Sequence, residues 1–139
     1  MHVMKRGFSL IELLVAMAII ALLATTIIAG VTHMQTKSRD TRRVEDISQI
    51  SKALELYYSS EYRFPKAETE VVLNNVDDIL TTTLIPAGAI SSISLDPIHP
   101  DYTYRYQTNS LGTTYTLRFC LETDSIKGYS AGCSNEKTP

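Results

Sequence analysis

The sequence predicts an α+β protein in which a long N-terminal helix packs on a small antiparallel sheet. Three patterns lead to this expectation. An apolar run covers residues 8–31, apolar side chains then recur at spacings of three and four over residues 44–58, and two segments after residue 100 alternate with a period of two. The first two patterns are typical of helices, and the third is typical of half-buried strands.

The apolar run from Phe8 to Val31 has 24 residues and contains no Lys, Arg, Pro or Asp. As a helix it would rise about 36 Å, enough to cross a hydrocarbon layer of about 30 Å. Lys5 and Arg6 precede it, so the positive-inside tendency places this end in the cytoplasm and the rest of the chain on the outer side. A secretory signal peptide is the alternative, but its apolar region is usually only about 7–15 residues long.

The composition narrows the possible functions. Charged residues make up 20% of the 139 residues and the formal net charge is -2, so no basic surface is expected to attract nucleic acid phosphates. The sequence has no nucleophile motif, phosphate loop or metal-spaced set of Cys and His residues, and His33 and His99 are expected to be exposed. We therefore expect neither an enzyme nor a nucleic acid partner.

Glu12 is the single charged residue in the apolar run. Near the end of a membrane helix its carboxylate could simply snorkel to the interface, but an ionisable group there also indicates a site that awaits a partner. Cleavage between Gly7 and Phe8 would supply a cation, because the new α-amine of Phe8 is largely protonated at neutral pH. A neighbouring subunit staggered along the helix axis could bring that amine to Glu12.

Residues 5–24 read KRGFSLIELLVAMAIIALLA and resemble the N-terminal signature of type IV pilin-like proteins, with similarity to the major pseudopilins of type II secretion systems. The resemblance implies that residues 1–7 are a leader peptide, which a prepilin peptidase removes after Gly7. It also implies that the new amino group of Phe8 is methylated and that Glu12 guides the subunit into a filament.

The same resemblance implies a division of the chain and a function. Residues 8–31 would form the transmembrane and filament-core helix, and residues 32–139 a pilin-like head that includes the amphipathic second half of the helix. The chain would be a structural subunit of a type IV pilus or a type II secretion pseudopilus, forming a helical homo-oligomer together with other pilin-like subunits. The prepilin peptidase, an inner-membrane assembly platform and a cytoplasmic ATPase would be its partners.

The resemblance also implies where the subunit resides. Before assembly it would cross the cytoplasmic membrane once with its N-terminus in the cytoplasm, and afterwards it would lie in an extracellular or periplasmic filament. The residues do not distinguish a pilus, a secretion pseudopilus and a DNA-uptake filament, or a major from a minor subunit. The alternative of a different class is a monomeric, membrane-anchored extracytoplasmic binding module in which Glu12 is merely tolerated.

The second half of the helix is expected within residues 39–65, RDTRRVEDISQISKALELYYSSEYRFP, which is similar to the helix ending in a Tyr-Pro or Phe-Pro element in major pseudopilins. The apolar stripe that should face the sheet consists of Val44, Ile47, Ile50, Leu54 and Tyr57 or Tyr58. The charged residues that we expect to be solvated are Arg42, Arg43, Glu45, Asp46, Lys52 and Glu55. Ion pairs between subunits of a filament are the alternative for this charged face. Without an internal proline the helix can reach about Tyr58, and Pro65 ends any continuation.

Beyond Pro65 we expect a mixed module. A short helix is predicted around residues 70–84, followed by a loop rich in Pro and Ser. The period-two alternation over residues 102–107 and 114–122 predicts two strands joined by a hairpin loop. A third strand, at an edge of the sheet, is predicted around residues 127–131.

Cys120 and Cys133 lie outside the apolar run, where an oxidising compartment would allow them to pair. The bridge would close a loop of 14 residues and would stabilise the head by about 3 kcal/mol through loop-closure entropy. Two unrelated thiols are the alternative.

Two further groups of side chains are candidate ligand sites. Tyr102, Tyr104 and Tyr106 are expected in the core or in a subunit contact, with an exposed stacking surface for glycan or single-stranded DNA as the alternative. Oxygen atoms gather near the C-terminus on Glu122, Asp124, Asn135 and Glu136. Some secretion pseudopilins bind calcium in that region, but the sequence has no calcium-loop pattern. We expect no cofactor, with calcium as the alternative.

Overall fold

The structure is a computed structural model that describes residues 7–139, apart from the side chains of residues 26–29. Lys5, Arg6 and the rest of residues 1–6 lie outside the described residues. The chain divides into two compact units, one ending at Gln35 and one running from Thr36 to Pro139. The elements, in chain order, are α1 (Leu10–Glu61), β1 (Val71–Val72), α2 (Ile79–Leu84), β2 (Arg105–Thr108), β3 (Tyr115–Leu121) and β4 (Gly132–Lys137).

The first unit is the apolar part of α1. It contains an 18-residue window with a mean hydropathy of 2.6, and in the described part of the chain α1 is the one helix that is long and apolar enough to cross a membrane. Its large apolar side chains, such as Leu14 and Ile20, are exposed. Covering so much apolar surface requires lipid or another protein. The division by role predicted at residues 7 and 31 stays a prediction.

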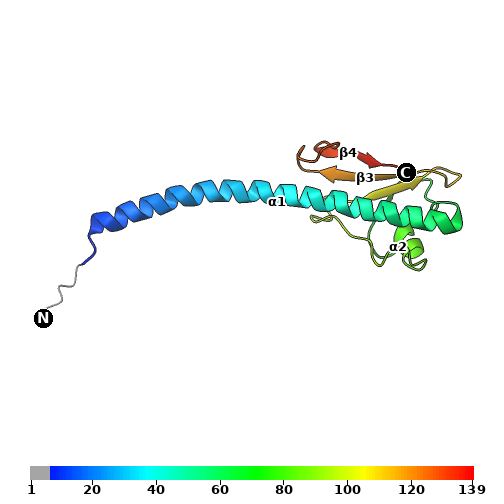
Figure 1. Cartoon of the computed structure of the whole chain (residues 1–139), viewed down its shortest axis with the longest axis horizontal. Coiled ribbons are helices and arrows are strands. Elements are labelled where there is room, and N and C mark those ends of the chain that lie inside the picture. The colour runs from blue at the N-terminus through cyan, green and yellow to red at the C-terminus, as the bar shows by residue number, and fades with distance from the viewer. Residues whose placement is uncertain (1–6) are drawn as a thin grey trace. The chain divides into compact units, whose positions relative to one another are not determined.

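The second unit packs four strands along the second half of α1 (Figure 1). The strand order is β1-β2-β3-β4, and all neighbours are antiparallel. Tyr106 of β2 lies opposite Leu117 of β3, which in turn lies opposite Lys137 of β4. The predicted fold class, a long helix with a small antiparallel sheet, is confirmed.

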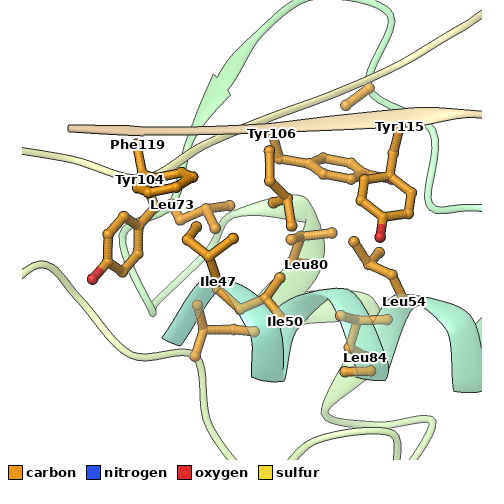
Figure 2. Packing of buried hydrophobic residues seen from close by; sticks show 14 of the residues in the cluster. Ile47, Ile50, Leu54, Leu73, Leu80, Leu84, Tyr104, Tyr106, Tyr115 and Phe119 are labelled. Carbon is orange, nitrogen blue, oxygen red and sulfur yellow. The ribbon is translucent and has the colours of Figure 1, made fainter. Parts of the chain in front are cut away.

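The core lies between α1 and the sheet. Figure 2 shows side chains of the strands pointing toward α1 and side chains of α1 pointing toward the sheet. The predicted stripe is confirmed, because Ile47, Ile50 and Leu54 are buried and Val44, Tyr57 and Tyr58 pack partly buried against them. Aromatic residues fill much of the opposing face, so a small head obtains a large buried area from few side chains. The buried aromatic residues are Phe64, Tyr104, Tyr106, Tyr115 and Phe119.

The segment after Pro65 is helical only in its last part, so the helix predicted around residues 70–84 is partly wrong. Val71 and Val72 instead pair with β2 as strand β1. Asn75 has a left-handed φ of 58°, which interrupts any helix there. Asp78 then caps α2 by accepting hydrogen bonds from the backbone N–H groups of residues 80 and 81, so the helix begins only at Ile79.

The hairpin between β2 and β3 is confirmed, but the predicted edge strand over residues 127–131 is wrong. The strand at that edge, beside β3, is β4, which begins at Gly132. Gly128 has a φ of 91°, and Ala131 N–H donates to Oδ1 of Asp124 at 2.6 Å. These features fold residues 122–131 into a loop and leave their backbone unavailable for a ladder.

Replacing Leu54, whose side chain is 0% exposed, with Ala should lower the free energy of unfolding by about 2–5 kcal/mol, because a cavity replaces packed atoms. Leu56 lies two residues away and is 56% exposed, so Leu56→Ala should change that free energy by less than about 0.5 kcal/mol. Urea unfolding of the full chain in detergent micelles, followed by circular dichroism, measures both. Equal losses would contradict the described core.

Candidate functional site

The segment expected to be cleaved precedes the first turn of α1. Gly7, Phe8 and Ser9 are non-helical and exposed, and the Phe8 side chain is 82% exposed. The peptide bond between Gly7 and Phe8 therefore lies outside the hydrogen-bonded helix. A peptidase could reach this bond without unfolding α1.

Glu12 has a local role that neither sequence interpretation anticipated. Its Oε2 accepts a hydrogen bond of 3.0 Å from the backbone N–H of Ser9, while α1 begins at Leu10. A Ser at the N-cap with a Glu three residues later is a capping box, in which the carboxylate satisfies an N–H group that the helix cannot. The spacing Ser9-x-x-Glu12 was the signal that could have identified this contact.

A shallow apolar depression of about 330 Å³ lies beside Glu12 on the same helix. It is lined by Ile11, Val15, Ala16 and Ile19 in addition to Glu12. The small side chain of Ala16 lets a neighbouring surface approach the helix closely. The depression thus presents an apolar surface next to a carboxylate.

In the second unit Arg43 lies on the core side of α1 and its side chain is 0% exposed. Nε donates to Oδ2 of Asp96 at 2.7 Å, and Nη2 donates to Oδ1 of the same carboxylate at 3.0 Å. Nη1 donates to Asp40 at 2.8 Å and to Glu122 at 2.7 Å. The ring of Tyr102 lies 4.9 Å from the guanidinium carbon. One buried cation therefore joins α1 to two loops.

A second arginine and the backbone complete this arrangement. Arg39 donates to both carboxylate oxygens of Glu122, at 2.8 and 2.6 Å. Asp40 accepts the N–H of Glu122 at 2.9 Å, and it accepts the N–H and hydroxyl of Thr123 at 2.9 and 2.7 Å. We call Arg39, Asp40, Arg43, Asp96 and Glu122 the Arg43 cluster. Among the described residues no buried side-chain N or O atom lacks a hydrogen-bond partner.

The expectation that the charged residues of the second helix half are solvated is wrong for Arg43 and Asp46. Arg43 is four residues before Ile47 and so continues the buried stripe. Asp46 is buried as well and accepts a hydrogen bond of 3.0 Å from the hydroxyl of Tyr104. Both charges are buried because partners from distant parts of the chain meet them there.

Burial and pairing shift the pKa values of Arg43 and Glu122. Burial lowers the pKa of Arg43, but hydrogen bonds to Asp96, Glu122 and Asp40 outweigh it and raise that pKa. The hydrogen bond from Arg39 lowers the pKa of Glu122 to about 2, with partial burial opposing and Arg43 adding to the effect. These groups therefore stay charged at neutral pH.

The two cysteines are joined in a disulfide, with Cys120 on β3 and Cys133 on β4. The bridge closes the loop that carries Glu122 and Thr123. Asn135 fixes the base of the loop by donating to the carbonyl oxygens of Ser130 and Gly132, at 2.8 and 3.0 Å.

The candidate ligand residues are largely occupied by these contacts. Both oxygens of Glu122 are paired, Asp124 and Asn135 bond to the loop backbone, and Glu136 pairs with Arg118 at 2.7 Å. No group of three His, Cys, Asp or Glu side chains in residues 7–139 is placed to hold a metal ion. His33 and His99 are exposed, as predicted.

Tyr104 and Tyr106 lie in the core, as predicted, so they cannot form an exposed stacking surface. The hydroxyl of Tyr106 donates to the carbonyl oxygen of Pro65 at 2.7 Å. Burial raises the pKa of both phenols, with the nearby Asp46 carboxylate adding to the effect at Tyr104.

The outer face of the sheet carries a row of paired charges. Arg105 and Arg118 lie opposite each other and both donate to Glu70, at 2.9 and 2.8 Å. Arg118 also donates to Glu136. These four side chains line a groove of about 410 Å³. Because each charge has a partner within the chain, the groove offers little uncompensated charge to a ligand.

Comparison with known proteins gives one family match and several relatives. The prokaryotic N-terminal methylation motif matches residues 3–28. The type II secretion system core protein G of Pectobacterium carotovorum subsp. carotovorum is 30% identical over 64 residues, which are 46% of this chain and 41% of that protein. Two proteins of the same name cover more. The protein of that name from Klebsiella michiganensis is 26% identical over 106 residues, which are 70% of this chain and 71% of that protein.

The protein of that name from Escherichia coli (strain K12) is 27% identical over 103 residues, which are 70% of this chain and 70% of that protein. No solved structure matches this chain. The matched motif includes Gly7, Phe8 and Glu12, the three residues singled out at the start of α1.

The stability of the head should fall at acidic pH because of Glu122. Its folded pKa of about 2 lies below its ordinary value of 4.5. The stabilisation by the ionised group is therefore complete above pH 4.5 and is lost as the pH falls toward about 2. Because water still reaches part of the group, we expect about 1–2 kcal/mol.

Urea unfolding of the full chain in micelles across this pH range would measure the effect. Glu122→Gln should remove this part of the pH dependence. Glu136→Gln is the matched control, since its carboxylate pairs with Arg118 outside the Arg43 cluster, and it should keep the dependence. Parallel pH profiles for the wild type and Glu122→Gln would show that the carboxylate is not held as described.

Proposed function

We propose that this chain, whose predicted resemblance to type IV pilin-like proteins is confirmed by the motif and the relatives, is a structural subunit of a pilin-like filament. The single observation that carries the proposal is the matched methylation motif at the start of an exposed apolar helix. The relatives are named for the type II secretion system, so we favour a secretion pseudopilus over a type IV pilus.

Processing would begin at the non-helical segment before α1. A prepilin peptidase cleaves after Gly7 and removes the leader, and the new amino group of Phe8 is then methylated. The non-helical, exposed segment of residues 7–9 supports this step. Cleavage places a protonated amine four residues before Glu12.

Assembly would use Glu12 twice. In the single chain its carboxylate caps the helix at the N–H of Ser9. In the filament it exchanges this contact for the Phe8 amine of a neighbouring subunit, while apolar side chains cover the depression formed with Ile11 and Val15. A charged pair in an apolar surrounding is stronger than a cap to a neutral N–H group. The exchange therefore favours the staggered neighbour.

The same proposal implies a membrane topology and a set of assembly partners for the subunit. The subunit crosses the cytoplasmic membrane once through α1 with its N-terminus in the cytoplasm, and the head lies outside. An inner-membrane assembly platform and a separate cytoplasmic ATPase add subunits to a periplasmic or extracellular filament with other pilin-like subunits. The work of the chain is mechanical, and we assign it no reaction.

The alternative of a monomeric anchored binding module has less support. The groove on the outer face of the sheet is its natural ligand site, but the charges of Arg105, Glu70, Arg118 and Glu136 pair with one another. A binding module also gives no reason for the methylation motif.

The head needs no calcium in this proposal, since two arginines neutralise Glu122 and a disulfide closes the loop. Thermal unfolding of the full chain in micelles should therefore give the same midpoint with excess calcium and with a chelator. A midpoint that rises with calcium would assign the C-terminal oxygens to a metal site.

The mass of the membrane-extracted chain tests the processing step. The mature protein should begin at Phe8 and carry one additional methyl group on its amino terminus. Gly7→Leu places a bulky side chain directly before the scissile bond, so we expect it to block cleavage and to leave the leader attached. A wild-type chain that retains Lys5 and Arg6 would leave only the anchored-module reading.

A variant at Glu12 can distinguish the capping of α1 by this side chain from the pairing of its charge with an amine. Glu12→Gln can still accept the N–H of Ser9, since Gln serves in capping boxes, but it cannot pair with an amine. We expect membrane insertion as in the wild type and loss of filaments in electron micrographs of cells. Glu68→Ala, at an exposed position of the head, is the control and should assemble. Normal filaments from Glu12→Gln would refute the charge pairing.

A further inference from the structure

We propose that the disulfide between Cys120 and Cys133 is a redox-sensitive lock that holds residues 121–132 against the Arg43 cluster. We call these residues the strap. Reduction would release the strap from residues 36–46 of α1 while the rest of the head stays folded. This inference concerns the head alone and does not depend on polymerisation.

The contacts of the strap to α1 lie immediately beside the disulfide. Glu122 and Thr123 follow Cys120 by two and three residues. The Asp40 carboxylate accepts hydrogen bonds from the backbone N–H groups of Glu122 and Thr123 and from the Thr123 hydroxyl. It also accepts one from Nη1 of Arg43. The Glu122 carboxylate in turn holds Arg39 and Arg43. Any movement of the chain after Cys120 therefore breaks charged contacts on α1.

The rest of the strap is weakly attached. Most of its residues from 124 to 132 are exposed, and only Ile126 and Tyr129 pack partly buried against the core. The ring of Tyr129 lies 5.2 Å from that of Phe119. The hydrogen bond between Asp124 and Ala131 is internal to the strap. Asn135 of β4 holds only the end of the strap, through its hydrogen bonds with Ser130 and Gly132. The covalent closure thus supplies much of its restraint.

The sheet does not need the strap to stay paired. β4 continues beyond the disulfide, and its residues Asn135, Glu136 and Lys137 pair with β3. The buried core, which includes Leu54 of α1, Leu80 of α2 and Tyr106 of β2, contains neither cysteine. Opening the bridge should therefore loosen the strap and its partners on α1 more than these elements.

A reductant has access to the bridge from one side, because Cys133 is exposed while Cys120 is buried. A thiolate of a dithiol reductant attacks Sγ of Cys133, the Sγ–Sγ bond breaks, and a mixed disulfide forms. The second thiol of the reductant then displaces Cys133. The two protein sulfurs take up two protons and two electrons, and the reductant becomes a disulfide.

Hydrogen–deuterium exchange of the full chain in detergent micelles tests the lock. Exchange is compared before and after dithiothreitol, with intact mass verifying that both thiols have formed. We expect reduction to speed exchange at least about tenfold in peptides covering residues 36–46 and 121–132, with little change over α2 and β2. Cys120→Ser/Cys133→Ser should reproduce this pattern.

A second variant shows whether the contacts carry the coupling. Glu122→Gln/Thr123→Val removes strap contacts but keeps the disulfide, so residues 36–46 should already exchange faster in the oxidised chain, and reduction should add little there. Two results would overturn the proposal. One is unchanged exchange over residues 36–46 in the reduced wild type, and the other is an equal acceleration throughout the head, which would make the disulfide a general staple.

Discussion

Arg43 lies on the core face of α1, and its side chain is fully buried. Its charge must therefore be compensated within the protein. An unpaired ion in this position would be strongly destabilising. Asp40 on the same helix, Asp96 in the loop before β2 and Glu122 after β3 meet this requirement. The path of two long loops is therefore set by one side chain of the helix. Burial of the aromatic core stabilises the same arrangement.

The same helix also carries a carboxylate with a much simpler environment. Glu12 has only the N–H of Ser9 as its described hydrogen-bond partner, in a segment whose apolar side chains are exposed. The buried charges of Arg43, Asp40 and Asp96 are paired within the chain, whereas the charge of Glu12 is only capped. This contrast fits a subunit whose head folds by itself and whose N-terminal segment is completed by other subunits.

Local patterns in the sequence predicted the fold well. The apolar run, the stripe through Ile47, Ile50 and Leu54, and the alternation in β2 and β3 each depend on neighbours a few residues apart. The Arg43 cluster could not be predicted in this way, because Asp96 and Glu122 are 53 and 79 residues from Arg43. A charged residue in a buried stripe indicates such partners without identifying them.

Two elements were predicted wrongly from the sequence, and both errors have the same physical cause. The strand predicted over residues 127–131 became a loop because side chains of Asp124 and Asn135 bond to its backbone, and the helix predicted from residue 70 was interrupted by the turn at Asn75. In both places short polar side chains compete with regular structure. At the N-terminus the spacing of Ser9 and Glu12 could have predicted that Glu12 caps α1. The pairing of Glu12 in a filament stays a prediction.

The buried Arg43 of α1 holds the loops of the head in place through its contacts with Asp96 and Glu122. A double-mutant cycle with Arg43→Met and Asp96→Asn, measured by urea unfolding of the full chain in micelles, tests this role most directly. Each single change leaves buried partners uncompensated, so the two should be coupled by at least about 2 kcal/mol. Effects that add to within about 0.5 kcal/mol would show that Arg43 and Asp96 act independently and that this ion pair does not hold the loop before β2.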